Sequence, residues 1–271
     1  MSRSMLSRTR RFAGVSVAVT VLVAAGTIAP ATAAQPPGLD HFVCYAASGT
    51  GFKTPNVLLQ NQFSPKGFQA ATGAVVSHCN PVVKTLPSGA VTGVRNPRAH
   101  LACVAIKPAT KQPSMVVDVV NQFGKARLTT GAPFALCLPS WKNPTTPKFP
   151  PATQPPGLDH FTCYRAAYLP GTAPLTLPAF VKLKDQFGTV TAKLGLPQAL
   201  CLPTAKTVNP ATGPTKVTNP RAHLLCLQVF PSQPVKLPRT VFDKNQFGIA
   251  KVTVTKTATL CLPSFKTIVK P

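Results

Sequence analysis

The chain is short of acidic residues. Of its 271 residues, 29 are Lys or Arg and 5 are Asp or Glu, which gives a formal net charge of +24. All five acids are aspartates, so the sequence has no glutamate. Glycoside hydrolysis usually needs two acids flanking one bond, and a calcium site needs several carboxylates. The shortage of carboxylates argues against both.

Helical periodicity is also missing. After residue 33, no stretch repeats its apolar residues every 3.6 positions over three turns, and the 31 prolines of the chain argue against long helices. Short β-branched or aliphatic segments bounded by Pro and Gly predict strands instead, as at Met115 to Val120, Leu224 to Phe230 and Lys251 to Thr255. We therefore predict an all-β fold.

The N-terminal region has the pattern of a secretory signal peptide. An uncharged run from Phe12 to Ala29 is followed by the small-residue site Ala31-Thr32-Ala33. Four arginines precede that run: Arg3, Arg8, Arg10 and Arg11. We predict a signal peptide at 1–33, cleavage near Ala33-Ala34, a secreted protein, and no transmembrane segment in the mature chain. The pair Arg10-Arg11 leaves Sec and twin-arginine export both open.

The remaining sequence repeats itself. Gln-Pro-Pro-Gly-Leu-Asp-His-Phe begins at Gln35 and again at Gln154, and Asn-Pro-Arg-Ala-His-Leu begins at Asn96 and at Asn219. This repetition predicts two tandem β domains, 35–143 and 154–271. The Pro- and Thr-rich segment 144–153 is expected to be a semi-rigid linker between them.

Each copy is itself doubled, which gives four units of about 60 residues. A unit contains His-x-x-Cys, then Gln-Phe, then Cys-x-Pro. We number the units by their first histidines: His41, His100, His160 and His223. Three Gln-Phe sites have Asn or Asp before them and Gly after them, which predicts hairpin turns at 121–124, 185–188 and 245–248. The phenylalanines are expected to fold back onto the core.

The eight cysteines all follow the predicted signal peptide. An even count in an exported chain indicates disulfides. The two cysteines of a unit are 34 to 38 residues apart, which favours pairing within each unit, although four cysteines per copy leave the two other pairings open. The preferred pairs are Cys44–Cys79, Cys103–Cys137, Cys163–Cys201 and Cys226–Cys261. On a strand, Phe42 shares a core face with Cys44, so His41 lies on the opposite face.

The recurrent motifs resemble an uncharacterised domain of exported bacterial proteins. The resemblance is carried by Leu-Asp-His-Phe-x-Cys-Tyr at 39–45 and 158–164, by Gln-Phe-Gly at 122–124, 186–188 and 246–248, and by Leu-Cys-x-Pro at 136–139, 200–203 and 260–263. It implies export and a repeated architecture. The family has no assigned activity, so the resemblance implies no site.

Metal binding and catalysis are disfavoured. Zinc requires converging thiolates, whereas His and Cys three apart on a strand face opposite ways and exported cysteines are oxidised. Asp40 and His41 are sequence neighbours whose side chains point apart on a strand, which does not suit a catalytic pair. His78 lies outside the repeated pattern and is expected to be an exposed turn residue. We predict no catalytic residue, no metal site and no cofactor, and lean away from an enzyme.

A binding role is the leading functional prediction. Arg98 and Arg221 occupy equivalent places in the two copies and are candidate anion contacts, with solvated turn residues as the alternative. Few aromatic residues are available for stacking, so specific nucleic-acid binding is not expected. We predict a secreted non-enzymatic binding or envelope-associated module with a basic surface, which attracts an anionic polymer or cell-envelope surface. A secreted hydrolase with an unrecognised site and a self-associating structural protein are the alternatives. The sequence leaves the ligand and the oligomeric state open.

Overall fold

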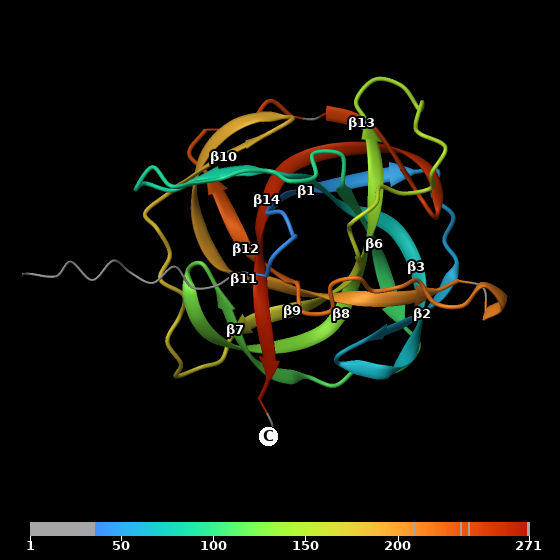
Figure 1. The fold of residues 1–271 in the computed structure, drawn as a ribbon, viewed down its shortest axis with the longest axis horizontal. Helices are drawn as coiled ribbons and strands as arrows, with labels where there is room; N and C mark the ends of the chain where they lie inside the picture. Colours follow the sequence, from blue (N-terminus) through green and yellow to red (C-terminus); the bar gives the residue numbers. More distant parts are fainter. Residues whose placement is uncertain (1–35, 209, 234, 238, 270–271) are drawn as a thin grey trace, which may run out of the picture. The chain divides into compact units, whose positions relative to one another are not determined.

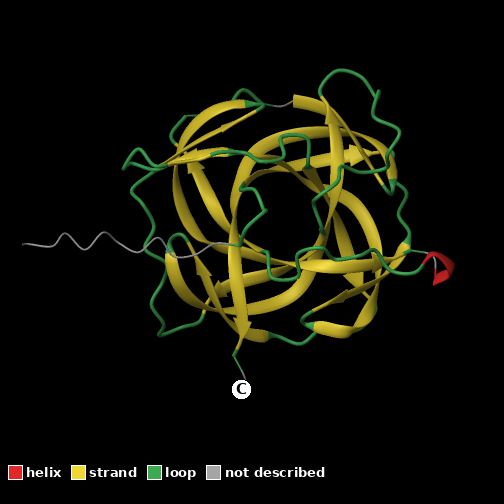
Figure 2. Cartoon of the chain, in the orientation of Figure 1, coloured by secondary structure: helices red, strands yellow, loops and turns green. Residues whose placement is uncertain are grey.

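The computed structural model of the protein describes residues 36–208, 210–233, 235–237 and 239–269. The predicted signal peptide, 1–33, and its cleavage site lie outside the described residues. In the described part, strands dominate and the one helical element is a single 3₁₀ turn, Pro210–Thr212 (Figure 2). The all-β prediction is confirmed. None of the described segments forms a helix with the length and hydropathy of a membrane span.

Eight strands pair edge to edge into one closed ring. Figure 1 views the molecule along the axis of this ring. Each unit supplies a short strand and the C-terminal part of a long strand. Every ring strand pairs antiparallel with both of its neighbours, and the last strand pairs with the first. In ring order the strands are β1 (Phe42–Thr50), β3 (Ser64–Pro81), β6 (His100–Pro108), β8 (Gly124–Asn143), β9 (His160–Tyr168), β11 (Gly188–Thr207), β12 (His223–Pro231) and β14 (Gly248–Ile268).

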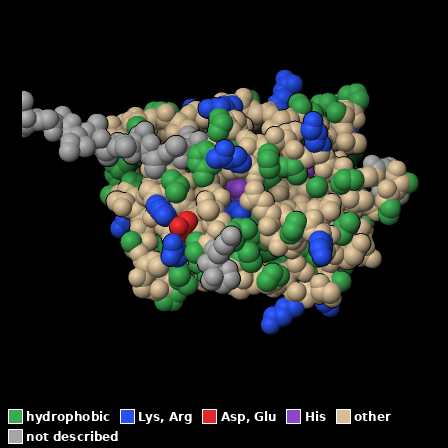
Figure 3. Space-filling view, turned by 60° about the horizontal axis from the view of Figure 1, so that its bottom comes forward, with side chains coloured by type: hydrophobic (Ala, Val, Ile, Leu, Met, Phe, Trp, Pro, Cys, Tyr) green, Lys and Arg blue, Asp and Glu red, His purple; other side chains and the backbone are tan. Residues whose placement is uncertain are grey.

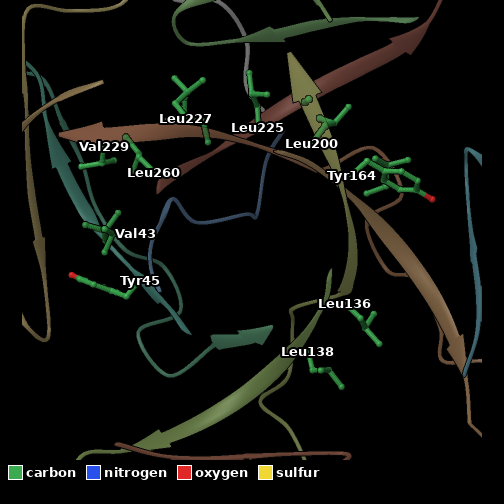
Figure 4. Packing of buried hydrophobic residues seen from close by; sticks show 14 of the residues in the cluster. Val43, Tyr45, Leu136, Leu138, Tyr164, Leu200, Leu225, Leu227, Val229 and Leu260 are labelled. Carbon is green, nitrogen blue, oxygen red and sulfur yellow. The ribbon is translucent and has the colours of Figure 1, made fainter. Parts of the chain in front are cut away.

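The ring buries both of its faces. Phe42 and Cys44 belong to a core inside the ring, together with the other seven cysteines. Val43 and Tyr45, which alternate with them along β1, belong to a second and larger core. Figure 4 shows these outer-core side chains on the outer side of the ring strands, directed away from its centre. The alternation predicted for this strand is therefore confirmed, and its opposite face is also buried.

A second layer of hairpins covers the outer face. Each long strand begins in a hairpin with a short partner: β2 (Asn56–Asn61), β7 (Met115–Asn121), β10 (Val181–Asp185) or β13 (Arg239–Asn245). The turns fall at the Gln-Phe sites as predicted, and Phe123, Phe187 and Phe247 are buried. In these turns the Asn or Asp side chain accepts a hydrogen bond from the Phe amide, as from Phe123 to Asn121 Oδ1 at 2.8 Å. Gly124 has φ 105°, a conformation that favours glycine.

The hairpins connect opposite sides of the ring. β2 of the first unit pairs with the end of β11 in the third unit, and β10 of the third pairs with β4 (Val83–Thr85), which follows β3 in the first. β7 of the second unit pairs with the end of β14, and β13 of the fourth pairs with the end of β8. A two-residue strand, β5 (Val91–Thr92), pairs with β4. Each unit therefore completes the sheet of the unit two places along the chain.

The predicted division into two domains, 35–143 and 154–271, does not describe this sheet. Strands of both copies are interleaved in its pairing, and the described residues of both copies belong to a single compact unit. The reason is the exchange of hairpins, since neither copy alone contains the strand that its own hairpin needs. The predicted linker, 144–153, has no strand and lies against the sheet: Trp141 Nε1 donates to the Ala152 carbonyl at 3.0 Å, and Lys244 Nζ donates to the Pro150 carbonyl at 2.7 Å.

We expect one cooperative unfolding transition rather than two. A shared sheet and a shared outer core cannot melt in halves without exposing apolar residues of the other half. Differential scanning calorimetry of the oxidised protein should give a van't Hoff enthalpy equal to the calorimetric enthalpy. Two resolved transitions would restore the two-domain description.

Candidate functional site

A belt of eight half-cystines runs around the inner face of the ring. The structure forms four disulfides, which are the pairs that the spacing favours: Cys44–Cys79, Cys103–Cys137, Cys163–Cys201 and Cys226–Cys261. The bonded residues stand directly opposite each other on neighbouring strands. Where units meet, the cysteines are offset by two residues along the strands and do not bond. There, Cys44 Sγ lies 3.5 Å from Cys261 Sγ. Strand register thus decides between the pairings that the sequence left open.

Side chains of different size lie on the two sides of this belt. On one side Phe42, Leu101, Phe161 and Leu224 fill the interior and are nearly inaccessible. On the other side the inner positions two residues from the cysteines carry mostly small side chains, including Ala46, Ser77, Ala105, Ala135 and Ala199. These do not fill the ring. A pocket of about 630 Å³ remains, with the cystines lining it.

The charged residues at this pocket are basic. Among the described residues that line it, Arg165 and Lys256 carry charge, and both are exposed at the rim. The Arg165 guanidinium lies 4.3 Å from the centre of the Phe134 ring, which holds it beside the opening. Gln198 and Gln228 add amide groups. The site therefore combines an apolar interior with hydrogen-bond donors and two cations at its mouth.

The four repeated histidines lie on the other side of the ring wall, in the outer core. His41, His100, His160 and His223 are each at most 3% exposed. Nε2 of His41 donates to Gln122 Oε1 of the next unit at 3.2 Å, and His223 makes the equivalent bond to Gln62. Burial, with a smaller contribution from Lys84, lowers the pKa of His41 to about 3. Burial likewise lowers the pKa of His160 to about 3 and that of His223 to about 4.

A lysine accompanies each histidine, fully buried in two of the units and partly buried in the other two, and the sequence analysis missed it. Each lysine lies over the Phe ring of the next unit's Gln-Phe turn, with Nζ 4.6 to 5.9 Å from the ring centre. Burial lowers the pKa of all four to about 8. They are Lys84, Lys142, Lys206 and Lys266, each five residues after the second cysteine of its unit. This constant spacing is the sequence signal from which the four lysines could have been identified.

The motif aspartates hold loops at the closed end of the ring. The Asp40 carboxylate accepts hydrogen bonds from the backbone amides of Arg95 and Asn96, both at 2.8 Å. Asp159 binds the equivalent Thr218 and Asn219. In the described residues, no group of three or more His, Cys, Asp or Glu converges as metal ligands.

Arg98 and Arg221 lie in the equivalent loops that precede β6 and β12, and both are exposed. Neither lines the pocket, which opens at the other end of these strands. The Arg221 guanidinium lies 5.6 Å from the centre of the Phe265 ring. The two candidate anion contacts, Arg98 and Arg221, are therefore not part of the pocket.

His78 is not the exposed turn residue that the sequence suggested. It lies within β3 and is fully buried, and its Nδ1 is 2.8 Å from Asp243 Oδ2, which is also fully buried. Its Nε2 lies 2.9 Å from Asn80 Oδ1. His78 and Asn80 occupy the outer-face positions on either side of Cys79. In the other three units those positions hold pairs of leucines: Leu136 and Leu138, Leu200 and Leu202, Leu260 and Leu262.

Comparison with known families gives one match. A family described as a repeat of unknown function, DUF7450, matches residues 100–263, more than half of the chain. The chain belongs to this family. The matched DUF7450 region runs from the first residue of β6 to the Cys-x-Pro of β14, so it spans the second, third and most of the fourth unit. No curated protein and no solved structure matches the chain.

Removing one disulfide should cost several kcal/mol. In the chain-entropy model, closing a loop of about 35 residues stabilises the fold by about 4 kcal/mol. We expect the double variant Cys103→Ala/Cys137→Ala to lose about that much, as measured by urea unfolding under oxidising conditions. Cys44→Ala/Cys79→Ala removes a disulfide that closes a loop of nearly equal length, and it serves as the matched comparison. An unchanged urea midpoint in both variants would show that these cysteines are not joined by disulfides.

The histidines should make the fold sensitive to mild acid. Their folded pKa values lie below the ordinary value of 6.5, so the unfolded chain binds protons first as the pH falls. Their stabilising contribution is complete above pH 6.5 and is lost as the pH falls toward 4 to 3. At pH 5, each of these histidines lowers the free energy of unfolding by about 2 kcal/mol relative to its value above pH 6.5. His160→Gln should reduce the difference in unfolding free energy between pH 7 and pH 5 by about that amount. An unchanged difference would show that His160 is not buried as a neutral group.

Proposed function

We propose that this protein is a secreted, non-enzymatic binding module that takes up a small apolar molecule carrying an acidic group. The observation that carries the proposal is the pocket of about 630 Å³ above the cystine belt. Its volume lies in the range of small-molecule sites, and a closed sheet of eight strands is wide enough to hold one small ligand.

The lining supports an apolar ligand body. All eight half-cystines and several alanines line the interior, with Phe134 and Phe161 as the aromatic contributors. Sulfur is polarisable and packs favourably against aromatic rings. Burying an apolar body in such a site contributes roughly 25 cal/mol for each Å² removed from water.

The rim supports an acidic group on that ligand. Arg165 and Lys256 can pair with a carboxylate, sulfonate or phosphate at the mouth while the apolar part enters the ring. The net charge of the chain would also draw anions toward the surface at long range. Both features favour an anion over a neutral molecule of the same shape.

The scaffold supports binding rather than catalysis. Cross-strand disulfides on all sides hold the pocket walls in place, so little conformational entropy is lost on binding. The histidines are buried behind the ring wall, and Asp40 and Asp159 are held in loop hydrogen bonds. The four disulfides fit an oxidising, extracellular compartment, as the predicted signal peptide also requires.

Attachment to an acidic wall polymer or lipid surface is a second candidate, favoured by the charge. Figure 3 shows lysine and arginine side chains spread over the visible face with few acidic ones between them. Dispersed charge of this kind favours non-specific adhesion that weakens as salt is added. Retention on a heparin-like matrix at low salt, with elution by moderate salt, is the corresponding measurement.

We expect the oxidised protein to bind anilinonaphthalene sulfonate, whose fused rings and acid group match the pocket, and to exchange it for dodecanoic acid. Ala135→Leu and Ala199→Leu place extra carbon atoms in the cavity and should abolish the fluorescence change. Ala109→Leu makes the same substitution at an exposed loop position outside the pocket and should leave it unchanged. Equal binding by all three variants would contradict the proposed site.

The rim cations can be tested separately. An exposed ion pair contributes up to about 1 kcal/mol, so Arg165→Gln should weaken dodecanoic acid binding by up to about fivefold. The same variant should bind dodecanol as the unmodified protein does. If both ligands weaken equally, Arg165 shapes the pocket and does not select the acid.

A further inference from the structure

A second cavity lies outside the ring, against the β13 hairpin and the end of β8. Its volume is about 440 Å³, and it shares no lining residue with the cystine-belt pocket. Three of its lining residues carry positive charge: Lys142, Lys236 and Arg239. The other described lining residues are neutral: Pro144, Gln186, Phe187, Thr240 and Val241.

Two of the cations are held on one aromatic ring. Lys142 Nζ lies 4.6 Å and the Arg239 guanidinium carbon 5.5 Å from the centre of the Phe187 ring. Lys142 Nζ also donates to Asn80 Oδ1 at 2.7 Å, and Arg239 Nε donates to the Lys236 carbonyl at 3.1 Å. The positions of both positive groups are therefore fixed, although they repel each other. A bound anion would relieve that repulsion.

The nearest acids do not occupy the cavity. Asp185 Oδ2 accepts hydrogen bonds from the Tyr45 hydroxyl at 2.9 Å and from Asn80 Nδ2 at 2.7 Å. Asp243 is fully buried and pairs with His78. Burial lowers the pKa of Lys142, with a smaller contribution from Arg239, whereas both carboxylates favour its charged form. The two carboxylates therefore help to keep Lys142 positively charged, but they do not line the cavity and leave its cations free to contact a ligand.

Comparison of the units shows that this arrangement is specific to one of them. Lys84 and Lys206 are almost completely buried, and each donates to the glutamine of the next unit, Gln122 or Gln246. At the equivalent position, Lys142 bonds to Asn80 instead and leaves Gln186 at the cavity wall. Lys142 and Lys266 are both only partly buried, but Lys266 lines neither cavity. Asn80 stands where the other units have leucine. The polar network around it directs this one lysine toward an open cavity.

We infer that this cavity binds a tetrahedral oxyanion, a phosphate or sulfate group. Arg239 offers the planar donor pair that suits such an oxyanion, and Lys142 and Lys236 add point charges. The volume leaves room for a small organic group attached to the anion. This site does not depend on the proposed function of the ring pocket.

Calorimetric titration of the full-length oxidised protein tests the inference. Inorganic phosphate, sulfate and phenyl phosphate are titrated separately at low ionic strength, with chloride keeping that strength constant. We expect saturable binding at one site per chain. Tighter binding of phenyl phosphate than of inorganic phosphate identifies an organic ester as the preferred source, whereas equal binding identifies the free ion.

Variants separate this site from general surface charge. Arg239→Gln and Lys236→Gln should weaken phosphate binding, Arg239→Gln by tenfold or more. Lys266→Met also removes one positive charge, at the fourth-unit lysine that corresponds to Lys142. Lys266 lines neither cavity, so this variant should change the phosphate affinity by less than twofold. Thermal unfolding confirms that each variant is folded. Absence of saturable binding, unchanged affinity in Arg239→Gln, or an equal loss in Lys266→Met would overturn the inference.

Discussion

The whole structure depends on the register of the ring strands, which the cross-strand disulfides hold in place. Each joins two cysteines that stand directly opposite each other on adjacent ring strands. A slip by one residue would move every side chain of a strand to the other face. With the cysteines held on the inner face, the two-residue period of a strand places Phe42 inside the ring and His41 outside it. The closed interior, the open pocket and the buried histidine layer all follow from that placement.

Exchange of hairpins turns four similar sequences into one interdependent body. In a solenoid, each repeat contacts only its neighbours along the chain. Here each unit contacts its neighbours through the ring and the opposite unit through its hairpin. No half of the chain contains all the partners of its own strands. The same repetition supplies four sets of His, Lys, Gln and Phe, each assembled from two units that are neighbours in the ring, with the histidine and the phenylalanine buried.

Departures from the repeat mark the places where a specific role can arise. Three units pack pairs of leucines beside the second cysteine, whereas the first places His78 and Asn80 there. Buried polar groups are costly unless they are hydrogen-bonded. Asp185, Asp243 and Lys142 supply the partners, and all three come from other units. One cluster is thereby different from the other three, beside a cavity lined by cations.

The sequence by itself determined the strand character, the fourfold repeat, the hairpin turns and the inward face of each cysteine. These are local properties, set by residue type, by the spacing of Pro and Gly, and by the alternation of side chains along a strand. The same local rules gave two domains and an exposed His78, because they contain no information about which distant strand a hairpin joins. The tertiary structure alone decided that the halves share one sheet, that both ring faces are buried, and that small side chains two residues from each second cysteine leave a pocket. Those outcomes depend on the closure of the ring, which brings together residues from all four units.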